Sequence, residues 1–228
     1  MNKKYELTGE TMERDGYTFH QIRALKDFDC HGISIKAGDI GGWVEEEGTL
    51  SQTGESWVLR YAEIHRGVSI GNNTIIGNDA YIGNGAHIGD GVSVGKRSSV
   101  CDGSSVGNNT HIGDNVHIGD GVRIRDGVQI RDGMRISNGT TINDGVQIDP
   151  GAYIGYGVFV RSNAHICLGA HIGDGSCIGV GASVGVEAFV DNSTSIADNA
   201  SVGDANGTPV GIDPISGRSR KPKKPNTK

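Results

Sequence analysis

One feature of this 228-residue sequence constrains its fold more than any other: an aliphatic side chain recurs every six residues. The recurring residue is Ile or Val at each of the 25 positions from Val58 to Val202. A second register, made mostly of smaller side chains such as Ala62 and Ala86, lies two residues earlier. Because residues two apart in a strand point to the same side, we expect both registers to face inward.

Each aliphatic is followed by residues that favour a corner. The usual order is Gly, then Asn or Asp, then often Gly, as in Ile88-Gly89-Asp90-Gly91. These residues tolerate positive φ or form Asx turns. Each hexad is therefore predicted to be a short strand and a corner, and successive units bury their aliphatic side chains by stacking.

This pattern resembles the hexapeptide-repeat superfamily over residues 58–202. The resemblance implies that three hexads make one triangular coil of about 18 residues, wound left-handed. We therefore predict an all-β fold whose main part is a left-handed parallel β-helix of about eight coils, over residues 56–205. The resemblance also implies a parallel homotrimer with three equivalent clefts between subunits.

The two ends depart from the period. Residues 1–55 contain strand-like segments at 17–25 and 32–35, and we interpret them as a β cap, because an open end of a β-helix exposes an unpaired edge. Residues 4–8, 22–25 and 38–45 resemble the N-termini of uncharacterised phage and prophage hexapeptide-repeat proteins. Residues 206–228 form a C-terminal extension, predicted to be disordered from about residue 216, where six basic residues occur without an acidic one.

Composition narrows the cellular setting. No apolar run approaches the length of a membrane span, and the N-terminus lacks an apolar signal-peptide core. The four cysteines show no metal-site spacing, so we predict reduced thiols in the cytoplasm. The net charge of −6 argues against a nucleic-acid-binding domain and leaves the basic tail as a weak contact only.

An acyltransferase is one functional alternative. Many hexapeptide-repeat proteins are CoA-dependent acyltransferases in which a histidine is the general base. On this alternative the donor is acetyl-CoA or another acyl-CoA, and the outward-facing candidates are His111, His117, His165 and His171. Such enzymes usually carry a loop that interrupts the helix, and this sequence has no insertion between residues 58 and 202. The leading prediction therefore has no catalytic residue and no cofactor.

A metal site is not predicted either. His111 and His117 are six residues apart, as are His165 and His171, which places each pair on different faces. His111 and His165 share a face but lie roughly 14 Å apart, too far for zinc bonds of about 2.1 Å. The stacked corner residues Asp90, Asn108, Asp126 and Asp144 are attributed to Asx turns.

The leading functional hypothesis rests on a basic and aromatic group in an otherwise acidic body. Arginine binds phosphate in a bidentate manner, and aromatic rings stack on bases. We predict a non-catalytic trimeric scaffold of phage origin that binds a small phosphate- or nucleotide-like anion between subunits. The predicted ligand-binding residues are Arg123, Arg125, Arg135, Arg161, Tyr153 and Phe159. Two alternatives remain open here: salt bridges from these arginines to Asp126, Asp132 and Asp149, and a structural spike or spacer of a virion.

Overall fold

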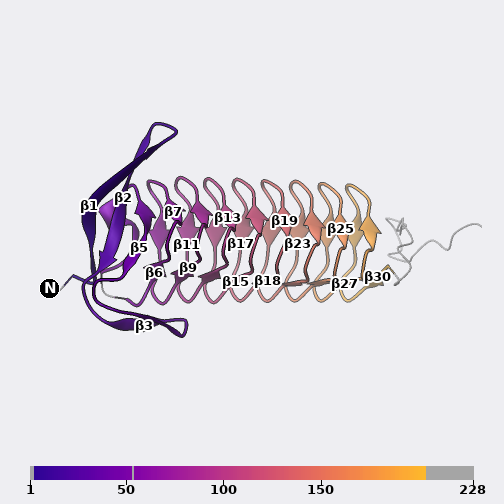
Figure 1. Cartoon of the computed structure of the whole chain (residues 1–228). Helices are drawn as coiled ribbons and strands as arrows, with labels where there is room; N and C mark the ends of the chain where they lie inside the picture. The colour runs from indigo at the N-terminus through magenta and orange to yellow at the C-terminus, as the bar shows by residue number, and fades with distance from the viewer. Residues whose placement is uncertain (1–2, 53, 204–228) are drawn as a thin grey trace, which may run out of the picture.

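The fold is an all-β parallel β-helix of about nine turns with antiparallel strands at its N-terminal end (Figure 1). The structure is a computed structural model that describes residues 3–52 and 54–203. The predicted β-helix is confirmed. The predicted disordered tail lies outside the described residues. Within them, no helix is long and apolar enough to cross a membrane.

Three parallel sheets form the faces of the prism, and every repeat strand is two residues long. Face I contains β7 (Glu63–Ile64), β10 (Tyr81–Ile82), β13 (Ser99–Val100), β16 (His117–Ile118), β19 (Arg135–Ile136), β22 (Tyr153–Ile154), β25 (His171–Ile172) and β28 (Phe189–Val190). Face II contains β8 (Ser69–Ile70), β11 (His87–Ile88), β14 (Ser105–Val106), β17 (Arg123–Ile124), β20 (Thr141–Ile142), β23 (Phe159–Val160), β26 (Cys177–Ile178) and β29 (Ser195–Ile196). Face III contains β6 (Trp57–Val58), β9 (Ile75–Ile76), β12 (Ser93–Val94), β15 (His111–Ile112), β18 (Gln129–Ile130), β21 (Gln147–Ile148), β24 (His165–Ile166), β27 (Ser183–Val184) and β30 (Ser201–Val202).

The predicted register holds throughout the β-helix. Strands pair with partners 18 residues away, as His111 does with Gln129, so outward residues stack into columns along each face. All 25 repeating aliphatics are at most 4% exposed. Burial of one such side chain contributes about 1.5–3 kcal/mol before the cost of ordering the chain. The core is therefore a continuous stack of Ile and Val along the prism axis.

Glycine serves two purposes in the corners. Gly91 has φ +67°, a conformation that side chains disfavour. The glycine that directly follows an aliphatic is needed for a different reason, because adjacent coils approach closely there. A Cβ atom on Gly95 would lie 2.3 Å from the carbonyl oxygen of Gly113 in the next coil.

The corner acids also connect neighbouring coils. Oδ1 of Asp126 accepts a hydrogen bond from the backbone amide of Asn108 at 2.7 Å, and Oδ1 of Asp144 accepts one from Asp126 at 3.1 Å. We predicted Asx turns at these positions. The bonds instead run between coils, because the 18-residue stacking places each side chain beside the preceding coil's amide.

The cap supplies the first turn of the β-helix. Its elements are β1 (Tyr5–Arg14), β2 (Tyr17–Ala24), β3 (Phe28–Cys30), β4 (Ile33–Ile35), β5 (Ile40–Val44) and the 3₁₀ helix η1 (Glu47–Thr49). Strand β1 pairs antiparallel with β2, and β2 with β5, whereas β5 pairs parallel with β7. Leu50 bridges to Ile70 on face II. These pairings explain why there are about nine turns instead of the predicted eight.

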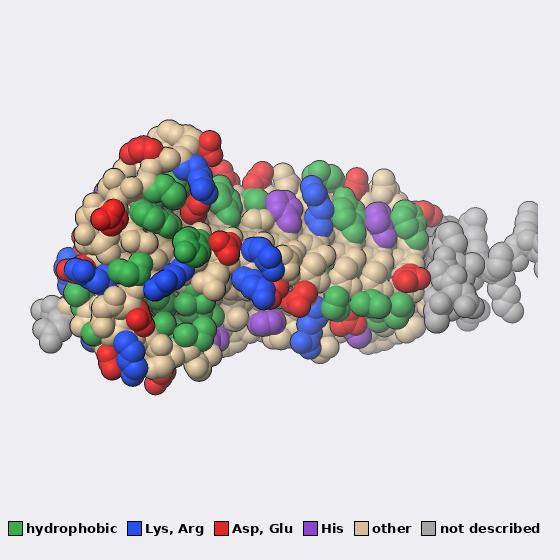
Figure 2. Space-filling view, in the orientation of Figure 1, with side chains coloured by type: hydrophobic (Ala, Val, Ile, Leu, Met, Phe, Trp, Pro, Cys, Tyr) green, Lys and Arg blue, Asp and Glu red, His purple; other side chains and the backbone are tan. Residues whose placement is uncertain are grey.

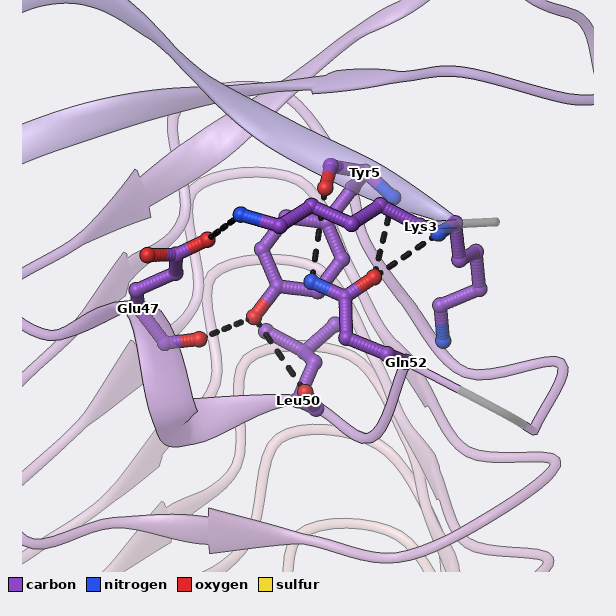
Figure 3. A network of polar contacts seen from close by, with 6 residues as sticks. Lys3, Tyr5, Glu47, Leu50 and Gln52 are labelled. Carbon is purple, nitrogen blue, oxygen red and sulfur yellow. Dashed lines mark hydrogen bonds and ion pairs between the residues drawn. The ribbon is translucent and has the colours of Figure 1, made fainter. Parts of the chain in front are cut away.

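Polar contacts attach the start of the chain to this first turn (Figure 3). The Tyr5 hydroxyl donates to the backbone oxygens of Glu47 and Leu50, and Lys3 Nζ lies 2.6 Å from a Glu47 carboxylate oxygen. Gln52 accepts from the Lys4 amide at 2.7 Å. The Lys4 side chain is buried, and its Nζ donates to Gly54 and Ser56. Burial lowers the pKa of Lys4 to about 8.

Candidate functional site

The corner between faces III and I carries both glycine and larger side chains directly after the aliphatic residue. The residue directly after the aliphatic is Gly77, Gly95 and Gly113 in three successive coils, and Gly185 near the end. Between them the same position holds Arg131, Asp149 and Cys167. Side chains also replace glycine at the corner between faces II and III, at Arg125, Asn143 and Arg161, so the substitution by itself does not mark a site. What distinguishes the corner between faces III and I is the chemistry of its side chains, a carboxylate and a thiol beside a histidine.

Asp149, Cys167 and the neighbouring His165 converge at this corner. His165 is the outward residue of β24, and Asp149 and Cys167 follow β21 and β24. The His165 Nε2 atom lies 2.9 Å from Oδ2 of Asp149. The Cys167 Sγ atom lies 4.0 Å from His165 Nδ1. The histidine side chain is 43% exposed and the aspartate 35%, so the group is open to solvent.

This geometry suits a general base. A carboxylate that accepts a hydrogen bond from Nε2–H fixes the neutral imidazole in one tautomer. The Nδ1 lone pair, which faces the Cys167 thiol at 4.0 Å, can then accept a proton, and the nearby carboxylate stabilises the imidazolium that forms. Asp149 and His165 are thus arranged to take a proton from a hydroxyl, amine or thiol.

The other three predicted histidines have different surroundings. His111 is half-buried on β15, three strands from His165 on face III. His117 Nδ1 lies 2.7 Å from the Ser99 hydroxyl, and burial followed by the charge of Arg135 lowers the pKa of His117. His171 stacks between Tyr153 and Phe189, at ring-centroid distances of 4.6 and 4.5 Å. Of these four, His165 is the one for which the described residues show a carboxylate partner.

The predicted ligand-binding residues lie on two faces. Arg135 and Tyr153 are neighbours on face I, whereas Arg123 and Phe159 are on face II with Thr141 between them. Arg125 and Arg161 follow β17 and β23 at the corner toward face III. One chain therefore does not gather the six residues into one pocket.

The ion pairs of Arg161 and Asp149 differ from the predicted salt bridges. Arg161 lies 3.6 Å from Asp198, whereas Asp149 contacts His165. No ion pair within the described chain joins the arginines to Asp126, Asp132 or Asp149.

Two surface hollows lie away from the His165 corner. A hollow of about 420 Å³ on face II is lined by His87, Ser105, Arg123, Arg125 and Asp126. A second, of about 400 Å³, lies against the cap and is lined by residues including Arg14, Trp43, Glu63 and Tyr81. Neither contains Asp149, His165 or Cys167.

Comparison with known families identifies the class of repeat. The model "Bacterial transferase hexapeptide (six repeats)" matches residues 73–108, 97–133 and 109–144. Together with the nine-turn prism, this match confirms the predicted hexapeptide-repeat β-helix. A comparison with curated proteins found no match.

Solved structures support the same fold. LpxA from Acinetobacter baumannii is 18% identical, with a TM-score of 0.65, and the match covers 68% of this chain and 66% of that one. The UDP-N-acetylglucosamine O-acyltransferase LpxA from Moraxella catarrhalis is 22% identical, with a TM-score of 0.63 and the same coverages. This chain thus spans just under two thirds of the length of each structure.

These comparisons correct the leading functional prediction. The matched family model is described as a transferase, and the two structures above are LpxA proteins, one of them titled an O-acyltransferase. The prediction of a non-catalytic scaffold that binds a small anion is therefore wrong, and the acyltransferase alternative is favoured. The phage origin stays a prediction.

Sequence reasoning nominated His165 but missed Asp149 as its partner, and it missed Cys167 altogether. Asp149 and Cys167 are 18 residues apart and therefore stack, which the repeat already implied. Their position, occupied by glycine in the earlier coils, was a second signal.

Proposed function

We propose that this protein is an acyltransferase with His165 as its general base. The observation that carries the proposal is the 2.9 Å contact between His165 Nε2 and Asp149 Oδ2. The proposed acyl donor is an acyl-CoA, and the acceptor is a hydroxyl or an amine. His165 Nδ1 removes the acceptor's proton as the acceptor attacks the thioester carbonyl. The carbon–sulfur bond then breaks, and the released thiolate takes up the proton.

We propose a homotrimer as the working form. Large exposed apolar side chains are concentrated in the later coils, at Tyr156, Phe159, Leu168, Val180, Val186 and Phe189. Figure 2 shows hydrophobic side chains aligned on the part of the β-helix nearest its C-terminal end. Of these, Leu168 and Val186 are 18 residues apart and stack at the corner that carries His165, and adjacent exposed apolar groups are typical of protein interfaces. A trimer would enclose the half-exposed His165 corner in a cleft between subunits.

We also place the protein in the cytoplasm. All four cysteines are free thiols, and Cys101, Cys167 and Cys177 are half-buried. Free thiols persist in a reducing compartment.

The test is CoA release from acetyl-CoA, assayed against a panel of hydroxyl and amine acceptors with a chelator present. His165→Gln should lower kcat/KM by about 100- to 10,000-fold. Asp149→Asn should lower it by less, because it disturbs the orientation of the base and leaves the base itself in place. His87→Gln is the matched control, an outward histidine on face II, and should retain activity. Full activity of His165→Gln would overturn the proposal.

A further inference from the structure

We propose that Asp149, His165 and Cys167 also form a binding site for one thiophilic divalent cation, for which zinc is the best fit. This site rests on the arrangement of the three side chains and holds whether or not the protein transfers acyl groups. The spacing of the histidines alone did not predict a metal site. The sulfur and oxygen donors lie in the corner and not in the outward columns that contain the histidines.

The donor set selects the metal. The corner offers one carboxylate oxygen, one imidazole nitrogen and one thiol sulfur from adjacent coils. Sulfur and imidazole ligands favour zinc and related transition metals, whereas magnesium and calcium prefer sites made of oxygen. Three protein ligands would leave a fourth tetrahedral position for water or another small ligand.

The distances allow one ion to reach all three groups. The donor atoms lie within 4.8 Å of one another. Zinc bonds of about 2.0–2.3 Å place tetrahedral ligand atoms roughly 3.5 Å apart. The side-chain tips would therefore need to move by about 1 Å, a shift available to side chains of this exposure. The backbone can stay in place, because Ile148 and Ile166 before the two corners are fully buried.

The neighbouring coil modulates the site. Arg131 occupies the same corner position one coil before Asp149, and its side chain is exposed. Its positive charge opposes cation binding across this short separation. Arg131→Ala should therefore raise the affinity for the cation. Substitution of a ligand residue should lower it, so the two kinds of variant have opposite effects.

Metal binding and proton transfer would compete at His165. The ion would displace the hydrogen bond from His165 to Asp149 and occupy a nitrogen. A loaded site would therefore inhibit acyl transfer, a consequence that rests on the proposed function. Binding itself is measured independently of activity.

The experiment titrates the reduced, chelator-treated full chain with cobalt(II), which gives a sulfur-to-metal charge-transfer band when a thiolate binds. We expect one cobalt per chain, displacement by zinc, and loss of the band in Cys167→Ser. Cys177→Ser is the matched control, since Cys177 is also a half-buried free thiol and lies on face II. His165→Gln and Asp149→Asn should each weaken binding at least tenfold.

Two results would overturn the site: a wild-type protein without the band, or a band that persists in Cys167→Ser. Circular dichroism and thermal melting of each variant verify that the β-helix is intact. Because acyl transfer is assayed with a chelator present, a failed metal titration and a failed acyltransferase assay are separate outcomes.

Discussion

Oδ1 of Asp126 accepts a hydrogen bond from the backbone amide of Asn108, one coil earlier in the prism, at 2.7 Å. Asn108 does the same for Asp90 at 2.8 Å, so one corner of the β-helix carries a ladder of side chains that satisfy backbone donors of the preceding coil. These hydrogen bonds are exposed to solvent, so each contributes a net stabilisation of about 0.5–1.5 kcal/mol. The corner acids therefore stabilise coil stacking.

Asp126→Ala should lower the free energy of unfolding by roughly 1 kcal/mol, because it leaves the Asn108 amide to water alone. Chemical denaturation measures this. Asp191→Ala is the control, since no hydrogen bond or ion pair of its side chain is described, and it should change stability by less than about 0.5 kcal/mol. Equal effects of the two substitutions would show that the ladder contributes nothing.

Gly95→Ala should destabilise the β-helix by about 1–3 kcal/mol, because its new Cβ would lie 2.3 Å from the Gly113 carbonyl oxygen. The measurement is again denaturant unfolding. Gly48→Ala provides the comparison, since a Cβ there meets nothing within 4 Å. A neutral Gly95→Ala would mean that coils separate more easily than their hydrogen bonds suggest.

Ile124→Asp should prevent folding of the β-helix, because it places a carboxylate in a position that is 2% exposed within the aliphatic stack. Circular dichroism and size-exclusion chromatography report the loss. Arg123→Asp changes the adjacent exposed residue of the same strand and should leave the fold intact. If the two variants behaved alike, the inward register would be wrong.

The contribution of Cys30 to stability should fall as the pH rises from 9 to 11, while buried Lys4, whose pKa is lowered to about 8, acts in the opposite direction, so the comparison with Cys30→Ala isolates the thiol. Burial raises the pKa of the Cys30 thiol from 9.0 to about 11. The folded pKa lies above the unfolded one, so the thiol's contribution is complete below pH 9 and is lost as the pH passes through 11. The difference in denaturant midpoint between wild type and Cys30→Ala should shift against wild type as the pH rises across this range. A difference in midpoint that stays constant with pH would exclude this contribution of Cys30.

The sequence predicted the three faces, the outward columns and the inward register, and the structure confirms them. From the sequence, the residues of β5 were expected to belong to a separate cap. In the structure, Trp43 of β5 pairs with Glu63 and forms the first rung of face I. That strand lies outside the six-residue period, so its pairing depends on how the cap folds back onto the prism. Hydrophobic periodicity carries no information on that contact.

The same division holds for the candidate site. The six-residue period, together with the three hexads per coil that the family resemblance implies, determined that Asp149 and Cys167 stack, because each coil takes the same number of residues and backbone pairing fixes the spacing. Only the tertiary structure decided that His165 turns toward Asp149 and lies beside Cys167, and not toward Gln147 or Ser183 in its own column. A repeat fixes Cα positions, whereas side-chain rotamers depend on which neighbours offer a hydrogen bond across the corner.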